Sequence, residues 1–514
     1  MIRIILLIFL LFSFFTGYSQ PTKGDANGNF ENGNYDIALQ QYLRLLKHDK
    51  ENVDFHYKIG LCYLRTDLDK SAAIPYLEFA QKDPKIDKSI MFDIGLAYYH
   101  SFKFDTAVTI LNAYKNSGIE DTTILKNIDE TIITINIAKN MYSHPVNVKL
   151  INVGEEINTK RAEYNPFVSA DETYLYYTSN KKYISDFQEL ISGIYMSQGT
   201  NGVWGKMKSL GSSINTDESI IIIGVSKDGS TIYSQPESYS FDMNIFYSNQ
   251  ERGRFREVVE LNKDINSKGV ECGASISNSG DTLYFASNRD GGFGGMDIYF
   301  SLKLPNGDWG MPQNAGNEIN TKYNENYPEI SRDGKRIYFC SDGYNSMGGY
   351  DIYFCRLGDD GKWSKPKNLG YPINDTYDNL TISLCGNDRY GYASLTRPEG
   401  FGDKDIYKVI FNNIDVQEII YKGKIACGDS LNPIALKDID PEISISVFNK
   451  DNGDLYGTYS YSHTTGKFIF SLEPGRYEIL IEGDSYLPYR KSFEILEGVY
   501  AEREYVLNIY LKKK

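Results

Sequence analysis

Histidine, paired cysteines and long apolar runs are scarce in this sequence of 514 residues. Its five His residues, at positions 48, 56, 100, 144 and 463, leave few bases for a Ser/His/Asp or Cys/His hydrolase, and no GxSxG motif occurs. The six Cys residues, at 62, 272, 340, 355, 385 and 427, have no CxxC spacing, which argues against a zinc site. We interpret them as small core residues and leave open a disulfide between neighbouring strands. We therefore predict a non-enzymatic chain with no metal and no cofactor.

Basic charge is also in short supply, because 54 Lys and Arg residues face 68 Asp and Glu residues. The net charge of −14 and the lack of a Lys/Arg cluster larger than Lys512–Lys514 argue against a surface that binds nucleic-acid phosphates. We expect no nucleic-acid partner.

The one long apolar stretch lies at the start of the chain. Arg3 precedes a mostly apolar run over residues 4–15, and the small residues Gly17 and Ser19 precede Gln20. This order is typical of a secretory signal peptide, which we place at residues 1–19; an uncleaved anchor is the alternative. We expect an exported, periplasmic protein with no transmembrane segment after cleavage.

A helical repeat follows the signal. Ala38, Ala72 and Ala107 are spaced 34 and 35 residues apart, and Gly60-Leu61-Cys62-Tyr63 returns as Gly95-Leu96-Ala97-Tyr98. The pattern resembles the tetratricopeptide repeat, in which small residues let two helices approach closely. We assign residues 20–142 to such repeats, with a capping helix around residues 124–141.

The resemblance implies a peptide-binding groove lined by the first helix of each repeat. The matching positions in the second and third repeats are Asp54, Tyr57, Leu61, Leu64, Ser89, Phe92, Leu96 and Tyr99. The alternative is that these side chains only pack against neighbouring helices.

A longer repeat belongs to strands. Its clearest copy is a strand that ends at Ser331, a turn through Asp333 and Gly334, and an aromatic strand back over residues 335–341. We place the repeated serine at Ser169, Ser226, Ser277, Ser331 and Ser383, and an equivalent acid at the start of the third strand at Asp297, Asp351 and Asp405. An acid at the same place in each copy indicates a structural role, because a catalytic site breaks such symmetry.

The first four copies each end in an Ile-Asn pair, the last copy has none, and a fifth pair, Ile157-Asn158, precedes the first copy. If this early segment completes the last copy, the strands form a closed ring without free edges. We therefore predict a five-bladed all-β propeller over residues 145–413, and the repeat resembles the TolB-type, WD-like propeller motif. The loops over residues 290–295 and 451–454 do not match a calcium-binding pattern, and we interpret them as turns.

The last part of the chain alternates short strands with Gly, Asn and Asp turns over residues 416–512. Its Gly466-Lys-Phe468 and Pro474-Gly-Arg-Tyr477 segments resemble the carboxypeptidase-regulatory-like β-sandwich; an immunoglobulin-like sandwich is the alternative. The predicted fold is thus multidomain: an all-α repeat solenoid, a propeller and a small β-sandwich.

The order of these modules resembles periplasmic proteins of the OmpA family associated with type IX secretion and gliding motility. In that family an OmpA-like domain follows the sandwich and binds peptidoglycan, and we expect no such domain here. The resemblance implies a protein-interaction scaffold near the outer membrane with envelope proteins as partners. A glycan- or peptidoglycan-binding module and a cryptic propeller hydrolase are the alternatives.

Overall fold

The computed structural model describes residues 21–184, 189–200, 202–237, 243–358, 360–385, 388–412, 419–428, 433–434, 443–462, 465–472, 475–495 and 504–514. The predicted signal peptide lies outside the described residues. The chain divides into two compact units. The first is Met1–Pro145, Asn152–Ser383 and Ala393–Tyr407; the second is Val146–Ile151, Leu384–Tyr392 and Lys408–Lys514. The helices therefore belong to the same compact unit as most of the strands that follow them.

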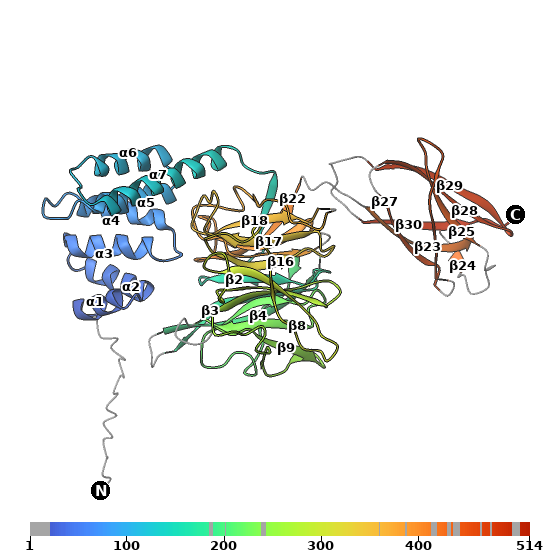
Figure 1. Ribbon diagram of the computed structural model, residues 1–514, viewed down its shortest axis with the longest axis horizontal. Coiled ribbons are helices and arrows are strands. Elements are labelled where there is room, and N and C mark those ends of the chain that lie inside the picture. Colours follow the sequence, from blue (N-terminus) through green and yellow to red (C-terminus); the bar gives the residue numbers. More distant parts are fainter. Residues whose placement is uncertain are drawn as a thin grey trace, which may run out of the picture. The chain divides into compact units, whose positions relative to one another are not determined.

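The N-terminal helical region is a stack of antiparallel helix pairs closed by a long helix (Figure 1). Its elements are α1 (Lys23–Glu31), α2 (Tyr35–Leu46), α3 (Val53–Leu64), the 3₁₀ turn η1 (Lys70–Ala73), α4 (Ile74–Ala80), α5 (Ile90–His100), α6 (Phe104–Lys115) and α7 (Thr122–Ser143). The helix predicted around residues 124–141 is α7, whose first turn is capped by the Asp121 carboxylate.

Two glycines explain why the helix pairs pack closely. A Cβ atom on Gly60 of α3 would lie 2.4 Å from the Leu77 side chain of α4, and one on Gly95 of α5 would lie 2.8 Å from Leu111 of α6. Only glycine leaves room for these two leucines, which are fully buried. The repeated Gly of the sequence pattern is thus a packing requirement.

Five sheets follow in the β-rich region over residues 148–411 (Figure 1). The first comprises β2 (Glu163–Val168), β3 (Tyr174–Ile184), β4 (Glu189–Thr200), β5 (Val203–Trp204) and β6 (Lys208–Ser209). The second comprises β7 (Ile220–Val225), β8 (Thr231–Pro236), β9 (Phe246–Glu251), β10 (Arg254–Phe255) and β11 (Val259–Glu260). The third comprises β12 (Glu271–Ile276), β13 (Thr282–Ser287), β14 (Asp297–Leu302) and β15 (Gln313–Asn314).

The fourth sheet comprises β16 (Glu325–Ile330), β17 (Arg336–Ser341), β18 (Asp351–Arg356) and β19 (Lys367–Asn368). The fifth comprises β20 (Ile382–Cys385), β21 (Tyr390–Leu395), β22 (Asp405–Phe411) and, from the start of the region, β1 (Val148–Asn152). Its order, β1-β22-β21-β20, joins the earliest strand of the region to the latest three.

The repeated Asn residues show how the early segment serves the last sheet. Asn320 accepts a hydrogen bond from the Ile298 backbone N–H at 2.7 Å and donates one to the Ile298 carbonyl at 2.9 Å. Asn158 makes the same two bonds to Ile406, 248 positions later, at 2.8 and 3.0 Å. The equivalent pairs in the other sheets are Asn215 with Ile194, Asn266 with Ile245 and Asn374 with Ile352.

Four of the five repeated serines close a turn, and the fifth does not. Ser331 donates to the Asp333 carboxylate at 2.6 Å and accepts from the Arg336 N–H at 2.8 Å. Ser169 and Ser226 make the equivalent bonds, and Ser277 accepts from the Thr282 N–H in the same way but donates to Asp281, four residues later. The assignment of Ser383 to this position is wrong, because Ser383 lies inside β20 and accepts from the Val168 N–H of the first sheet at 3.0 Å. This contact corresponds to the bond from the Ile330 N–H to Ser275, two residues before the turn serine.

The C-terminal region contains two four-stranded sheets that share one buried apolar core. The first comprises β23 (Ile419–Gly428), β24 (Pro433–Ile434), β27 (Lys467–Leu472) and β30 (Glu504–Leu511), and β30 pairs with β23 in parallel. The second comprises β25 (Ser444–Asn449), β26 (Leu455–Tyr459), β28 (Gly475–Gly483) and β29 (Tyr486–Ile495). All six Cys residues of the chain are buried and free.

Candidate protein interface

Three glycine-rich loops connect the second and third strands of the third, fourth and fifth sheets. They are residues 288–296, 342–350 and 396–404, and each is followed by the Asp that begins the third strand: Asp297, Asp351 or Asp405. All three carboxylates are buried at equivalent positions. Each of them accepts hydrogen bonds from the backbone of its loop.

The carboxylates hold the loops through backbone N–H groups. Asp297 accepts from the Phe293 N–H at 2.6 Å and the Gly294 N–H at 3.1 Å. Asp351 accepts in the same way from Met347 at 2.8 Å and Gly348 at 3.1 Å. Asp405 accepts from the Phe401 N–H at 2.6 Å. These bonds tie the apex of each loop to the start of the strand that follows it.

A second glycine position brings each loop against the segment that follows an Ile-Asn pair. A Cβ atom on Gly294 would lie 2.2 Å from the Thr321 carbonyl, one on Gly348 would lie 2.3 Å from the Tyr377 carbonyl, and one on Gly402 would lie 2.4 Å from the Arg161 carbonyl. Backbone therefore packs on backbone at all three places, which only glycine permits.

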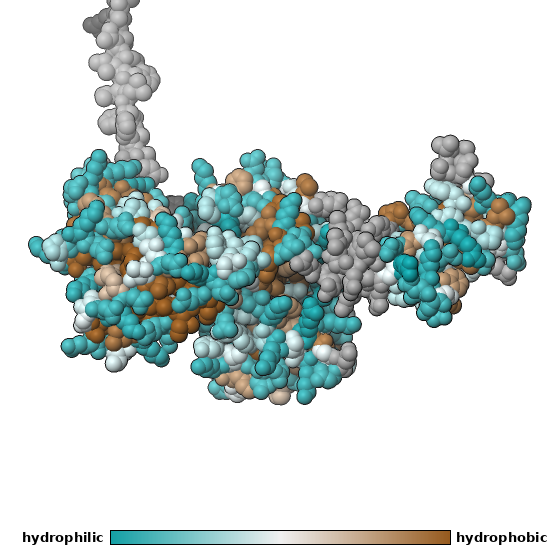
Figure 2. Space-filling model, turned by 90° about the horizontal axis from the view of Figure 1, so that it is seen from above, coloured by the Kyte–Doolittle hydropathy of each residue, from teal (hydrophilic) through white to brown (hydrophobic). Residues whose placement is uncertain are grey.

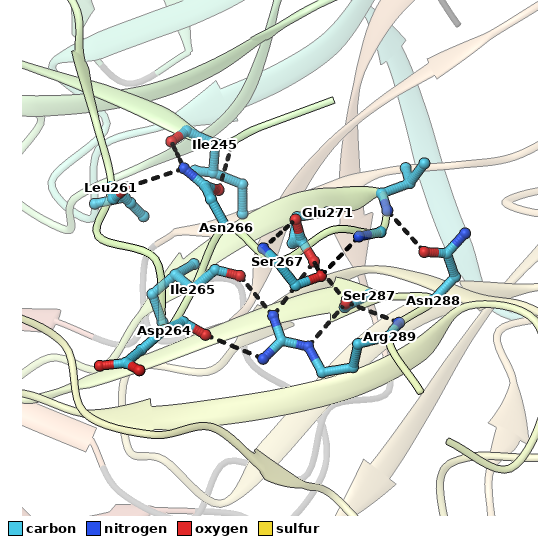
Figure 3. A network of polar contacts seen from close by, with 12 residues as sticks. Ile245, Leu261, Asp264, Ile265, Asn266, Ser267, Glu271, Ser287, Asn288 and Arg289 are labelled. Atoms are coloured by element: carbon cyan, nitrogen blue, oxygen red, sulfur yellow. Dashed lines mark hydrogen bonds and ion pairs between the residues drawn. The ribbon is translucent and has the colours of Figure 1, made fainter. Parts of the chain in front are cut away.

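The first of these loops is anchored by Arg289 (Figure 3). Its guanidinium donates to the Asp264 and Ile265 carbonyls at 3.1 and 2.5 Å and lies 3.3 Å from the buried Glu271 carboxylate. Glu271 also accepts from Ser267 and Ser287, at 2.6 and 2.7 Å. Arg289 thus joins the start of the loop to the segment before β12, so that the loop projects from a rigid base.

The apex of each loop carries a large apolar residue, but the three residues meet different surroundings. Phe293 is 53% exposed, Phe401 is 46% exposed, and Met347 is completely buried. Met347 lies in the apolar cluster of the helical region, together with Tyr99 of α5 and Phe104 of α6. The Tyr99 hydroxyl donates a short hydrogen bond to the Met347 carbonyl. One glycine-rich loop is therefore a docking point for helices α5 to α7.

The neighbouring segment, residues 375–378, completes this docking point. The Tyr377 hydroxyl accepts from the Lys70 N–H at 3.0 Å, and the His100 ring lies 5.3 Å from the Tyr377 ring. His100 Nδ1 lies 3.2 Å from the Thr376 hydroxyl. Burial holds the pKa of His100 well below its usual value, so the ring is neutral in this contact.

The third loop contributes an ion pair to the same docking. Lys404 Nζ lies 3.0 Å from the Asp67 carboxylate, and the Thr396 hydroxyl donates to the Asp67 carbonyl at 3.3 Å. Asp67 is half exposed, so water screens the pair and its contribution to stability is small.

The predicted groove residues fall into two groups. Phe92 and Leu96 are half-buried and pack on the cluster that contains Tyr99 and Met347, so in the third repeat these positions face an internal contact. Tyr99 itself is buried there. For Tyr99 the prediction of a free groove is wrong, because the loop apex occupies its place.

The second repeat keeps polar groups half exposed. Asp54 forms ion pairs with Lys23 at 3.2 Å and Lys58 at 3.6 Å, and Tyr57 donates to Asp93 at 3.2 Å. Burial raises the pKa of Asp93 to about 6. The others of the predicted set are Leu61, which is buried, and Leu64 and Ser89, which are half-buried.

Sequence reasoning missed the docking residues. Met347 lies in a segment to which the sequence pattern assigned no role, and Tyr377 follows the Ile-Asn pair that ends a repeat. The available signal was a comparison of the repeats position by position, since Met347 stands four residues before Asp351 as Phe293 stands four before Asp297. That comparison locates the apolar residue at the apex of each loop, but it does not show which apex the helices cover.

The space-filling view shows apolar residues gathered into patches among hydrophilic ones, with the largest group at the left, on the helical region (Figure 2). Within the described parts of the chain, no group of three or more His, Cys, Asp or Glu side chains is placed to hold a metal ion. None of the described helices is both long and apolar enough to cross a membrane.

Comparison with protein-family models finds a TPR repeat at residues 27–67. Residues 27–67 form a tetratricopeptide repeat. The match covers α2 and α3 completely, and we call residues 23–143 the TPR region. No curated protein matches the chain.

Several solved structures are similar to parts of this chain. TolB from Acinetobacter baumannii is 15% identical over 48% of this chain and 54% of its own, with a TM-score of 0.32, so just over half of the TolB length is spanned. An α-L-arabinofuranosidase from Lactobacillus brevis is 10% identical over 49% of this chain and 91% of its own, with a TM-score of 0.32. A Trypanosoma rangeli sialidase is 9% identical over 67% and 89%, also with a TM-score of 0.32. At these TM-scores the likeness is a loose one.

Proposed function

We propose that this protein is a non-enzymatic protein-interaction scaffold of the bacterial cell envelope. The observation that carries the proposal is that a loop of the β-rich region already serves as a protein-docking surface, where Met347 inserts between the helices of the TPR region. The β-rich region repeats such loops, and it is joined to TPR helices, a kind of repeat that provides extended binding surfaces. This combination suits the assembly of several protein partners.

The architecture that we propose has three modules. The five sheets are the blades of a five-bladed propeller over residues 145–413, which β1 closes in the manner of the TolB-type motif. The two C-terminal sheets face each other as a carboxypeptidase-regulatory-like sandwich over residues 416–512. The signal at residues 1–19 exports the chain to the periplasm, where it associates with the outer membrane. The module order favours a complex of the type IX secretion and gliding kind.

The buried carboxylates of the first strands support a structural rather than a catalytic role. Glu163, Glu271 and Glu325 are fully buried at equivalent positions. Glu163 accepts from the Thr159 N–H and the Ser179 hydroxyl, both at 2.8 Å. Glu325 has the equivalent bonds to Thr321 and Ser341. Each carboxylate holds its own blade together, whereas a glycosidase needs two carboxyl groups that flank a substrate.

Affinity purification of the tagged full chain from its native host tests the proposal. We expect envelope proteins to co-purify at a constant ratio and to remain bound after a second purification step. Binding to a glycan array without any protein partner would favour the glycan-binding alternative. Turnover of a panel of aryl glycosides or peptide amides by the pure chain would refute the non-enzymatic assignment.

A further inference from the structure

Two of the three glycine-rich loops share one surface, an apolar apex beside a tyrosine, and only one of these two surfaces is covered; the third loop has Arg161 at the tyrosine position. The covered copy is formed by Met347 and Tyr377, which are 0% and 6% exposed. Phe293 and Tyr323 stand at the corresponding positions of the preceding sheet and are 53% and 43% exposed. We call Phe293, Tyr323 and the adjacent Lys322 the open apex.

The correspondence between the two copies rests on backbone geometry. Phe293 and Met347 both donate their N–H to the Asp four residues later. Tyr323 and Tyr377 both follow an Ile-Asn pair by three residues, and each contributes a carbonyl on which Gly294 or Gly348 packs. Phe293 and Met347 therefore project from the same loop backbone, and each loop packs on the carbonyl of the corresponding tyrosine.

The covered copy shows what kind of surface fits this frame. Met347 fills an apolar pocket between helices α5, α6 and α7, a tyrosine hydroxyl bonds its carbonyl, and the end of α5 lies against Tyr377. A second copy of this chain cannot supply the same pocket, because its own Met347 occupies it. The occupant of the open apex is therefore another protein.

The charge at the open apex differs from the covered copy in one respect. Lys322 replaces Thr376, which lies beside His100, and its ammonium group lies 5.0 Å from the Tyr323 ring centre. Lys322 and Tyr323 are exposed. A helix placed here as α5 is placed on the covered copy would end beside a lysine instead of the Thr376 hydroxyl. A carboxylate on that helix would complement the lysine.

We propose that the open apex binds an α-helical hairpin of a second protein, with Phe293 inserted between its helices and an acidic residue facing Lys322. The inference rests on the proposed scaffold function and names the kind of partner that one of its surfaces takes. Aromatic side chains that enter a pocket at the centre of an interface are the residues whose loss weakens binding most.

Site-specific photo-crosslinking in the native host tests this proposal. The photoreactive residue p-benzoyl-phenylalanine replaces Phe293 in the full chain, and a matched variant carries it at Met311, an exposed apolar position outside the glycine-rich loops. We expect position 293 to crosslink to residues in two adjacent helices of one other protein. Tyr323→Asp should lower the yield about tenfold or more, and Lys322→Glu should lower it in a salt-dependent manner.

Each other outcome overturns the proposal. A crosslink to a second copy of this chain, to a glycan or to a β-strand would assign the surface to a different occupant. A yield at position 293 no higher than at position 311, or one unchanged by Tyr323→Asp in a variant with wild-type thermal unfolding, would show that the apex is not a binding site. Envelope partners that still co-purify with the Tyr323→Asp chain would leave the scaffold function standing, whereas a wild-type chain without partners would refute both.

Discussion

Replacement of Met347 by alanine should weaken the junction between the TPR region and the β-rich region while leaving both folded. Met347 is completely buried in a cluster whose other fully buried members come from α5, α6 and α7. Truncation of a buried methionine to alanine costs about 2 to 5 kcal/mol, because transfer energy and packing are both lost. The backbone bonds from Tyr99 and to Asp351 do not depend on the side chain and remain.

The loss should appear first as opening of the junction, since neither module loses a core residue of its own secondary structure. A loss of about 2 kcal/mol would raise the population of the open state about thirtyfold. Hydrogen exchange measured by mass spectrometry should therefore speed up in α5 to α7 and in residues 342–350, with smaller changes in the sheets β7–β11 and β12–β15. The urea midpoint of the whole chain should fall as well.

Phe293→Ala is the matched control, because it removes a larger side chain from the same position of an equivalent loop. Phe293 is more than half exposed, so we expect a change within about 0.5 kcal/mol and no effect on exchange in the TPR region. Equal destabilisation by the two substitutions, or an unchanged exchange rate in α5 to α7 of the Met347→Ala chain, would refute the assignment of Met347 as the docking residue.

Three further predictions concern single polar groups. Tyr99→Phe leaves the buried Met347 carbonyl without its donor, so we expect a loss of about 1 to 3 kcal/mol in urea unfolding, and no loss would show that another group or water takes over the bond. Asn158→Ala removes both bonds to Ile406 and should lower the free energy of unfolding by about 2 kcal/mol, as Asn266→Ala should by removing the equivalent bonds to Ile245. If Asn158→Ala alone left the stability unchanged, Asn158 would not join the early segment to the last sheet. Burial raises the pKa of Asp93 in the folded chain from 3.8 to about 6, so the folded state keeps this proton to a higher pH than the unfolded chain and the free energy of unfolding falls as pH rises through this window. In thermal unfolding followed from pH 4 to pH 7, Asp93→Asn should remove about 1 to 2 kcal/mol of that fall. An unchanged pH profile would contradict the burial of this carboxyl group.

The elements of the fold could be predicted from the sequence where their stabilising contacts are local. The spacing of Gly60 and Gly95 requires close helix pairs, and both glycines lie against leucines of the next helix. The turn after Ser331 forms from bonds that span at most five residues. Ser383 was assigned to the wrong position because its hydrogen bond is not local but joins it to another sheet. β20 reads Ile-Ser-Leu-Cys, with a single serine, so the pattern alone did not distinguish a turn serine from one two residues earlier that bonds the neighbouring sheet.

By itself, the sequence determined the helical repeat, the strand repeat and the pairing of Asn158 with the last sheet, because each depends on a residue type recurring at a regular interval. Only the tertiary structure decided which of three equivalent loops is covered. The Tyr99 bond to Met347 joins residues 248 positions apart, and the Lys70 bond to Tyr377 joins residues 307 positions apart. Among the residues that the structure describes, neither contact repeats. The loop apexes carry similar apolar residues, but α5 to α7 pack on Met347, whereas Phe293 stays exposed.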